Sequence, residues 1–422
     1  MHQNTLIALS IPLIVYILTR SKKRYPPGPR RLPLIGNLLD IPLRHAYEKF
    51  AQYSKDLDSD IIYIDAAGTP FIVLNSRYHQ TMAYELIDGR RLFAMLPYGE
   101  EWREGRRIMV KHLTSSDQKP IFSAITDFVH KSLMPNLLTT PDEFQIHIRN
   151  GVGGSILSLA YGFPIKRVND PWIKLAEQGM HSLTSAAAPG KYAVDVIPAL
   201  KYLPAWFPGA GFQREAKEWK KTFARFFEVP FKAAKKGMMD GTVKPSFLSR
   251  SLEEIADSPA KERLEQVIEN ISGMFSAGGT DTSVTAVTNF IAILLLFPEV
   301  QEKAQVEIDA VIGPNRLPEL SDKASLPYLK AVLKGLLRWK PVVPTGPPHM
   351  ASEVDVYRGY YIPKGAIIMG NSWATGIMHD EKIFPEPFQF DPTRFLTPCG
   401  QVNPDKSIPN PEAVCTFGYG RR

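Results

Sequence analysis

Cysteine is scarce in this 422-residue sequence, which contains only Cys399 and Cys415. Two cysteines cannot build a disulfide framework, a zinc ribbon or an all-cysteine iron–sulfur site, and such low usage is typical of a reducing compartment. The sequence also lacks a strong excess of charge, because 50 Lys and Arg against 43 Asp and Glu leave only +7. Charge this mild and scattered argues against a nucleic-acid-binding protein, and it suits a membrane surface or an acidic redox partner.

The remaining composition is that of a globular protein, with 44% hydrophobic and 22% charged residues. No repeat or low-complexity segment divides the chain, so we expect one large domain. Helical patterns dominate: an apolar run covers residues 263–297, and a second helix follows over residues 298–312. Two regions rich in β-branched and aromatic residues, 60–76 and 354–369, predict short hairpins. The sequence therefore predicts a mainly α fold with a small β portion.

The first 33 residues differ from the rest. Residues 6–18 are apolar and uncharged, and basic residues follow at once: Arg20, Lys22, Lys23 and Arg24. The run is shorter than the roughly 20 residues of a full span, but its charge lies on the wrong side for a signal peptide. We expect residues 1–19 to form a retained membrane anchor, 20–33 a basic, proline-rich hinge or plain linker, and 34–422 a single cytosolic domain.

Local helix rules are broken at one place, from Ala277 to Ser283 inside the long apolar run. Gly278 and Gly279 each cost about 1 kcal/mol relative to alanine in a helix interior. The four polar residues after them compete for backbone hydrogen bonds. Such a conflict is typical of a functional site, where glycines admit another group and hydroxyls or a carboxylate bond to it. The alternative is a close helix crossing through small residues.

This stretch resembles the central helix of the cytochrome P-450 family, the haem-thiolate monooxygenases. The family motif is Ala/Gly-Gly-x-Asp/Glu-Thr-Thr/Ser, and Gly278 to Ser283 matches all six positions. Further resemblances follow in the family's order: the PPGP hinge at 26–29, W-x-x-x-R at Trp102 and Arg106, the K-helix end at Arg338, the strand at 347–349, the meander at 371–395 with Arg394, and the start of F-x-x-G-x-R-x-C-x-G at 417–422. One such motif is weak, whereas the ordered set is specific.

The resemblance implies a cytochrome P-450 fold with haem b (iron protoporphyrin IX) and O2 as cofactors, and oxidation of a small lipophilic substrate. Thr282 would hydrogen-bond the iron-bound oxygen while Asp281 delivers protons. Room for oxygen above the porphyrin would come from Gly278 and Gly279, and Ala277 would also contact the cofactor. The other cofactor contacts would be Trp102, Arg106, His349, Phe417, Gly420 and Arg422, of which the tryptophan, the histidine and the two arginines would hold the propionates.

The resemblance also implies partners and a location. Electrons would come from NADPH through a separate NADPH-cytochrome reductase, with cytochrome b5 as an optional donor and no nucleic acid involved. The chain would sit in the endoplasmic reticulum membrane. Residues 204–209, an apolar tip around Trp206, resemble the family's membrane-dipping segment, although Trp206 could equally pack on the core.

Residues 200–209 and 356–364 resemble fungal secondary-metabolism members that oxidise aromatic polyketides, terpenoids or indole amines. The resemblance does not choose among these substrates. A cationic amine would require a pocket carboxylate, and the sequence alone assigns none.

Three departures from the family pattern stand out. Arg422 ends the sequence two positions before the expected iron-binding cysteine, so we expect the 422-residue chain by itself to be inactive. Gly335 replaces the glutamate that would pair with Arg338 and Arg394, a loss typically worth about 3–5 kcal/mol in a buried network. The segment after Arg91 is too short to roof a substrate pocket. An incomplete gene model explains these departures better than a degenerate copy, for which a haem-free binding role is the rival function.

Overall fold

The computed structural model describes residues 24–417, apart from residues 34, 42–45, 60, 67–68, 74–80, 114–118, 167–169, 188–190, 345, 347–348, 372, 374–377 and 406. The predicted anchor and the start of the predicted hinge lie outside these residues. The described part of the hinge is attached to strands: Tyr361 N donates to the Arg24 carbonyl at 2.7 Å, and Tyr63 N donates to the Pro27 carbonyl at 2.8 Å.

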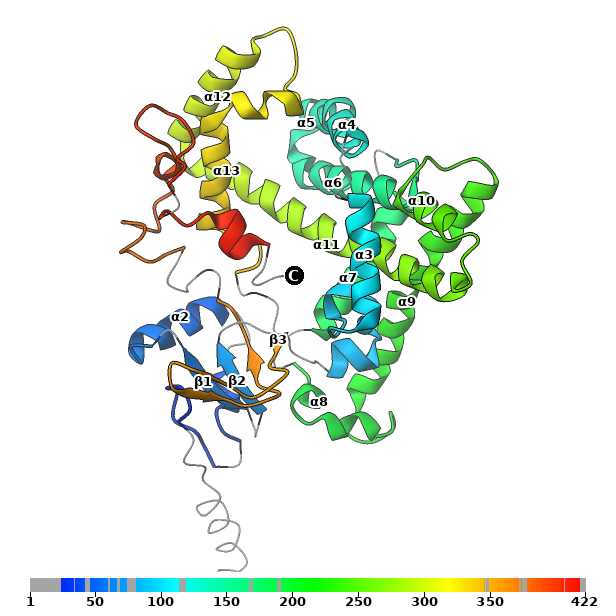
Figure 1. Cartoon of the computed structure of the whole chain (residues 1–422), viewed down its shortest axis with the longest axis vertical. Helices are drawn as coiled ribbons and strands as arrows, with labels where there is room; N and C mark the ends of the chain where they lie inside the picture. Colours follow the sequence, from blue (N-terminus) through cyan, green and yellow to red (C-terminus); the bar gives the residue numbers. More distant parts are fainter. Residues whose placement is uncertain are drawn as a thin grey trace, which may run out of the picture.

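Helices make up most of the described chain, as the sequence predicts (Figure 1). The helices are α2 (Ala46–Asp56), α3 (Glu100–Leu113), α4 (Lys119–Phe128), α5 (Met134–Thr139), α6 (Phe144–Tyr161), α7 (Pro171–Ala186), α8 (Ala193–Val196), α9 (Gly211–Met239), α10 (Phe247–Glu254), α11 (Lys261–Leu296), α12 (Pro298–Ile312) and α13 (Pro327–Trp339).

The longest helix, α11, crosses the middle of the molecule in Figure 1 and contacts α3, α6, α9, α10 and α13. It ends where Phe297 leaves helical geometry, with φ −131° and ψ 73°. The next residue, Pro298, opens α12 at its first position, where the missing N–H costs nothing. The predicted helix pair, including its break, is therefore confirmed.

A small sheet has the strand order β1-β2-β6-β3. The predicted hairpin is formed by β1 (Ile62–Ala66) and β2 (Thr69–Val73), which pair antiparallel. β6 (Ile367–Ile368) runs parallel to β2, and β3 (His349–Met350) runs antiparallel to β6. A separate hairpin joins β4 (Asp355–Tyr357) to β5 (Tyr360–Ile362) through two residues of positive φ, Arg358 and Gly359. Paired positive φ values suit the strand twist of a two-residue hairpin loop.

Apolar residues gather in several clusters that divide the core by element. One large cluster joins Phe223, Phe226 and Phe227 of α9 to Ala277 of α11. A second packs Ile268 and Ile271 of α11 against residues of α6 and α10. Smaller clusters lie under the sheet. The first half of α11 is thus embedded between two apolar clusters.

Candidate active site

Residues 277–283, the stretch that breaks helix rules, are helical throughout and lie within α11. The two glycines have different surroundings. A Cβ on Gly279 would lie 2.6 Å from Cδ1 of Ile156 on α6, so this glycine lets two helices pack closely. A Cβ on Gly278 would meet no atom within 4 Å. Of the pair, only Gly278 leaves open space beside the helix.

Hydroxyl groups continue the open face of α11 beyond Gly278. Thr282 and Thr285 are both exposed. Thr282 Oγ1 donates to the Gly278 carbonyl at 2.7 Å, and Thr285 Oγ1 donates to the Asp281 carbonyl at 2.8 Å. These bonds turn each hydroxyl proton toward the helix and leave the oxygen able to accept another hydrogen bond. We call Gly278, Thr282 and Thr285 the open face of α11.

Asp281 reaches across to α6 and, through it, to α7. Its Oδ1 accepts a hydrogen bond from Arg149 Nη1 at 2.9 Å, and Arg149 Nε lies 3.4 Å from Glu177 Oε1. Sequence reasoning did not find Arg149 or Glu177. No local signal could have found them, because the partners Arg149 and Asp281 are 132 positions apart.

Two other predicted contacts lie on α3 and one on β3. Trp102 is buried, and its ring stacks on Phe93 with 5.3 Å between centroids. Arg106 is exposed, with its guanidinium carbon 5.9 Å from the centre of the Trp102 ring. Within the described chain no carboxylate lies at ion-pair distance from Arg106. Helix α3 contacts α11, and β3, where His349 lies, is the edge strand on the side of the small sheet that faces these helices in Figure 1.

The family model of cytochrome P-450 matches residues 26–422. The chain belongs to the cytochrome P-450 family. It is 37% identical to cytochrome P-450 monooxygenase ple1 of Rhodocybe pseudopiperita, over 98% of this chain and 81% of that protein. It is 36% identical to the tryptamine 4-monooxygenase of Psilocybe cyanescens, over 95% of this chain and 82% of that protein. Cytochrome P-450 monooxygenase 98 of Postia placenta is 37% identical over 100% of this chain and 84% of its own length.

A cytochrome P-450 holds haem, and the described residues fit such a group. The open space at Gly278 would let a flat ring and a small ligand approach the helix backbone. Arg106, an exposed guanidinium without a carboxylate partner in the described chain, suits a propionate. Trp102 and His349 are the further donors that the family pattern assigns. The fit rests on free space and an available cation at the positions that the sequence predicts.

The expected region of the iron ligand is described only in part. Phe417 is 78% exposed, whereas Gly420, Arg422 and the side chain of Cys415 lie outside the described residues. Cys399 is exposed, and a hydrogen bond with Thr397 lowers the pKa of its thiol. In the described part of the chain, His, Cys, Asp and Glu form no group of three that could hold a metal ion. Cys399 is therefore a surface thiol.

The buried arginine of the K-helix region has partners that the sequence did not reveal. Arg338, fully buried, donates to the carbonyl oxygens of Met378, Pro387 and Gln389 at 2.9, 2.8 and 3.1 Å. Burial, with the nearby charge of Arg394, lowers the pKa of Arg338 to about 10. Its Nε has no hydrogen-bond partner in the described chain. Three carbonyl dipoles thus stabilise this cation in place of the family's glutamate, which Gly335 replaces.

The second arginine of the expected network, Arg394, and the glycine in place of the glutamate, Gly335, have neighbours of their own. Arg394 Nε lies 3.8 Å from Asp391 Oδ2, and its Nη2 donates to the Glu386 carbonyl at 3.2 Å. Asp391 therefore lies at ion-pair distance from Arg394, whereas Arg338 meets backbone carbonyls. A Cβ on Gly335 would lie 3.0 Å from two ring atoms of Phe390, so the aromatic ring fills the space beside this glycine.

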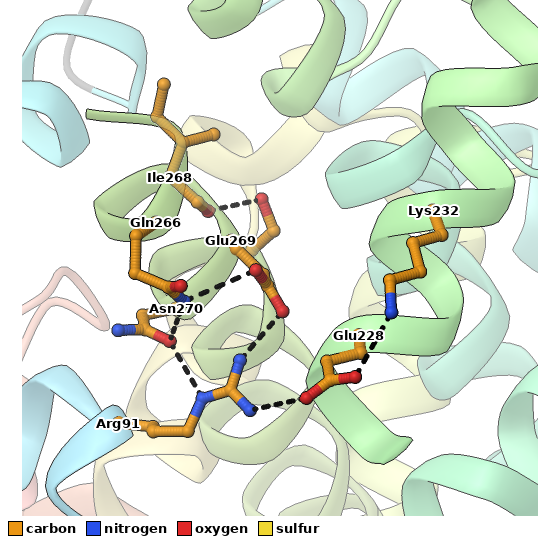
Figure 2. Close-up of polar contacts among 8 residues, drawn as sticks. Arg91, Glu228, Lys232, Gln266, Ile268, Glu269 and Asn270 are labelled. Atoms are coloured by element: carbon orange, nitrogen blue, oxygen red, sulfur yellow. Dashed lines mark hydrogen bonds and ion pairs between the residues drawn. The ribbon is translucent and has the colours of Figure 1, made fainter. Parts of the chain in front are cut away.

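Arg91, in the segment that follows Asp88, joins this segment to α9 and α11 through polar contacts (Figure 2). Arg91 Nη2 donates to Glu269 Oε1 at 2.7 Å, its Nε donates to Asn270 Oδ1 at 3.1 Å, and its Nη1 lies 3.6 Å from Glu228 Oε1. The guanidinium also stacks on Phe227, 4.5 Å from the ring centre. We call these residues the Arg91 cluster, and four of them, Arg91, Glu228, Glu269 and Asn270, border a polar cavity of about 760 Å³.

Proposed function

We propose that this cytochrome P-450 is a haem-dependent monooxygenase that oxidises a small lipophilic substrate. Bound haem would activate oxygen, and the residues around it would direct that reaction toward the oxidised product. Three relatives reported above are named as monooxygenases, which supports the reaction class. The proposal rests on the family and on one structural observation.

That observation is the open space at Gly278 beside Thr282 and Asp281. A small ligand held there would meet a hydroxyl oxygen that can accept a hydrogen bond and, on the adjacent residue, a carboxylate that can pass a proton from water. Glycine at this position has no evident packing reason, since added atoms would contact nothing. In an exposed helix position it costs about 1 kcal/mol relative to alanine, so a functional reason accounts for it better.

The substrate is proposed as a small lipophilic molecule, and one relative is named a tryptamine 4-monooxygenase. An amine would need a carboxylate free to receive its ammonium group. Of the four carboxylates that border the polar cavity, Glu228 and Glu269 are engaged by Arg91 and Asp88 by Arg90, whereas Glu101 forms no ion pair in the described chain, so a cationic amine stays an alternative substrate. A role in fungal secondary metabolism is part of this proposal.

The location is proposed to be the endoplasmic reticulum membrane, with electrons from NADPH through a separate reductase. An exposed aromatic tip supports membrane contact: Tyr202, Trp206 and Phe207 are 80, 79 and 43% exposed. Trp206 does not pack on the core, the alternative that the sequence left open. Aromatic residues of this kind favour the membrane–water interface.

A carbon monoxide difference spectrum tests the proposal. It is recorded on the purified protein expressed from its full-length transcript. We expect a thiolate-type Soret band from this protein, and the inactivity of the 422-residue chain by itself stays a prediction. A colourless protein would favour the rival, a haem-free binding protein.

Gly278→Leu tests whether the ligand binds in the open space beside α11. Leucine is a strong helix former, and its Cβ would meet no atom within 4 Å at this position, so the variant should fold like the wild type. It would fill the open space and abolish carbon monoxide binding while haem absorbance persists. Undiminished carbon monoxide binding in this variant would show that the ligand lies elsewhere.

A further inference from the structure

Asp281 is held from one side only. Arg149 Nη1 bonds its Oδ1 at 2.9 Å, while no described residue bonds its Oδ2. Arg149 in turn has Glu177 Oε1 3.4 Å from its Nε. The three side chains come from α11, α6 and α7 and form a chain of charges, Glu177 to Arg149 to Asp281. The arrangement leaves one carboxylate oxygen available to water.

Stability does not explain this chain of charges. Arg149, Glu177 and Asp281 have side chains that are 36, 43 and 44% exposed. Ion pairs with such access to water contribute little to folding. Moreover, α6 and α11 are already joined by close packing, with Ile156 against Gly279 and Thr280 against Gly153. A contact that the fold does not require, at a residue of the candidate site, points to a role in orientation.

Orientation matters because proton transfer demands a fixed path. A guanidinium keeps its charge throughout the physiological pH range and presents donors in a rigid plane, so it fixes the carboxylate without exchanging protons with it. With Oδ1 held, Oδ2 takes a proton from a water that solvent reprotonates and releases it toward the open face of α11, and the carboxylate returns to its starting state. No electron is transferred in these steps, and Glu177 limits the movement of Arg149.

We infer that Arg149, braced by Glu177, is a positioning residue that orients the Asp281 carboxylate for proton transfer to the open face of α11. The inference rests on the proposed function. It adds to that function two residues, on α6 and α7, that lie outside the sequence motif.

Carboxyl labelling tests the contact without haem. Carbodiimide-activated coupling of glycine ethyl ester, read by peptide mass spectrometry, reports how available each carboxylate is. In Arg149→Gln we expect Asp281 to label about two- to fivefold faster, the range that corresponds to an exposed ion pair. Arg263→Gln is the matched control, because it breaks the pair between Arg263 and Glu104 near the start of the same helix. Equal labelling of Asp281 in Arg149→Gln and the wild type overturns the inference.

The haem-loaded protein then tests the role, with indole as a lipophilic probe. Arg149→Gln should consume NADPH at near the normal rate but release about tenfold more of the oxygen as hydrogen peroxide, with a larger solvent deuterium isotope effect. Glu177→Gln should shift both readouts in the same direction by less. Arg149→Lys should restore part of the coupling, and all variants should keep the wild-type melting temperature.

The outcomes separate the inference from the function on which it rests. Faster labelling with unchanged coupling and isotope effect overturns the positioning role and leaves the monooxygenase proposal standing. A wild-type protein that binds no haem overturns the proposed function, and the role in turnover falls with it. Faster labelling, lost coupling and rescue by lysine together support the inference.

Discussion

The two halves of α11 meet different surroundings. Before Gly278, the helix is held by the Arg91 cluster, in which the side chains of Arg91 and Glu269 are 13 and 11% exposed. After Gly278, the open face begins, and the side chains of Arg149 and Asp281 are 36 and 44% exposed. In each half, an arginine from another segment forms an ion pair with a carboxylate of α11. The cost of breaking such a pair depends on its access to water. Removing one partner of a buried pair leaves a charge with neither a partner nor solvent, whereas the charge left by an exposed pair is solvated.

The open half is unusual for a helix of this composition. The most apolar 18-residue window of α11 has a mean hydropathy of 1.3, yet only 17% of it is buried. Exposed Leu295 and Leu296 extend the uncovered surface to the end of the helix. A core helix that is uncovered along one side has room for a bound group, which is the property that the candidate site requires.

The largest effect is expected at Arg338, the most deeply buried cation described here. Arg338→Met would remove the donors of three hydrogen bonds and leave buried carbonyl oxygens without partners. We expect a loss of about 4 kcal/mol in the free energy of unfolding, measured by urea titration. Lys334→Met, one turn earlier and partly exposed, should change this value by less than about 1 kcal/mol. Similar losses in the two variants would contradict the link between burial and stability.

Breaking the Arg91 cluster should have the next largest effect. Glu269→Ala leaves Arg91 with Asn270 and the more distant Glu228, so we expect the protein to lose about 3 kcal/mol of stability. Glu265→Gln is the control, because Glu265 lies one turn earlier on α11 and pairs with a partly exposed Lys235. Its loss should stay below about 1 kcal/mol in the same urea titration. A Glu269→Ala variant as stable as this control would remove the contrast between the two halves.

Sequence reasoning recovered the features whose cause is local. The hairpins follow from β-branched runs and turn residues such as Arg358 and Gly359, and the end of α11 follows from Pro298. The candidate site was visible because Gly278 to Ser283 breaks local helix preferences at one place.

The features that sequence reasoning missed depend on the tertiary fold. Arg91 and Glu269 are 178 residues apart, and Arg149 and Asp281 are 132 apart. Nothing near either arginine indicates its partner. Similarly, Gly335 gave no indication that Phe390 occupies the space beside it. Pairings of this kind depend on how helices pack, which local patterns do not specify.

The same substitution, glycine to alanine, at two positions of α11 tests how differently its two halves are packed. A Cβ on Gly273 would overlap the ring of Phe227, on which Arg91 stacks, so Gly273→Ala should cost about 2 kcal/mol through overpacking. A Cβ on Gly278 meets nothing, so Gly278→Ala should stabilise the helix by up to about 1 kcal/mol. Thermal unfolding of both variants checks the opposite signs. Equal shifts would mean that the two halves are equally packed.

The smallest change in stability is expected at the exposed ion pair. Arg149→Gln should alter the free energy of unfolding by less than about 1 kcal/mol, because water solvates Asp281 and Glu177 once the guanidinium is gone. The double variant Arg149→Gln with Asp281→Asn should equal the sum of the single variants within about 0.5 kcal/mol in urea titration. A coupling of several kcal/mol would place this pair in the same class as the Arg91 cluster. A structural role would then account for Arg149, and the orientation argument would lose its premise.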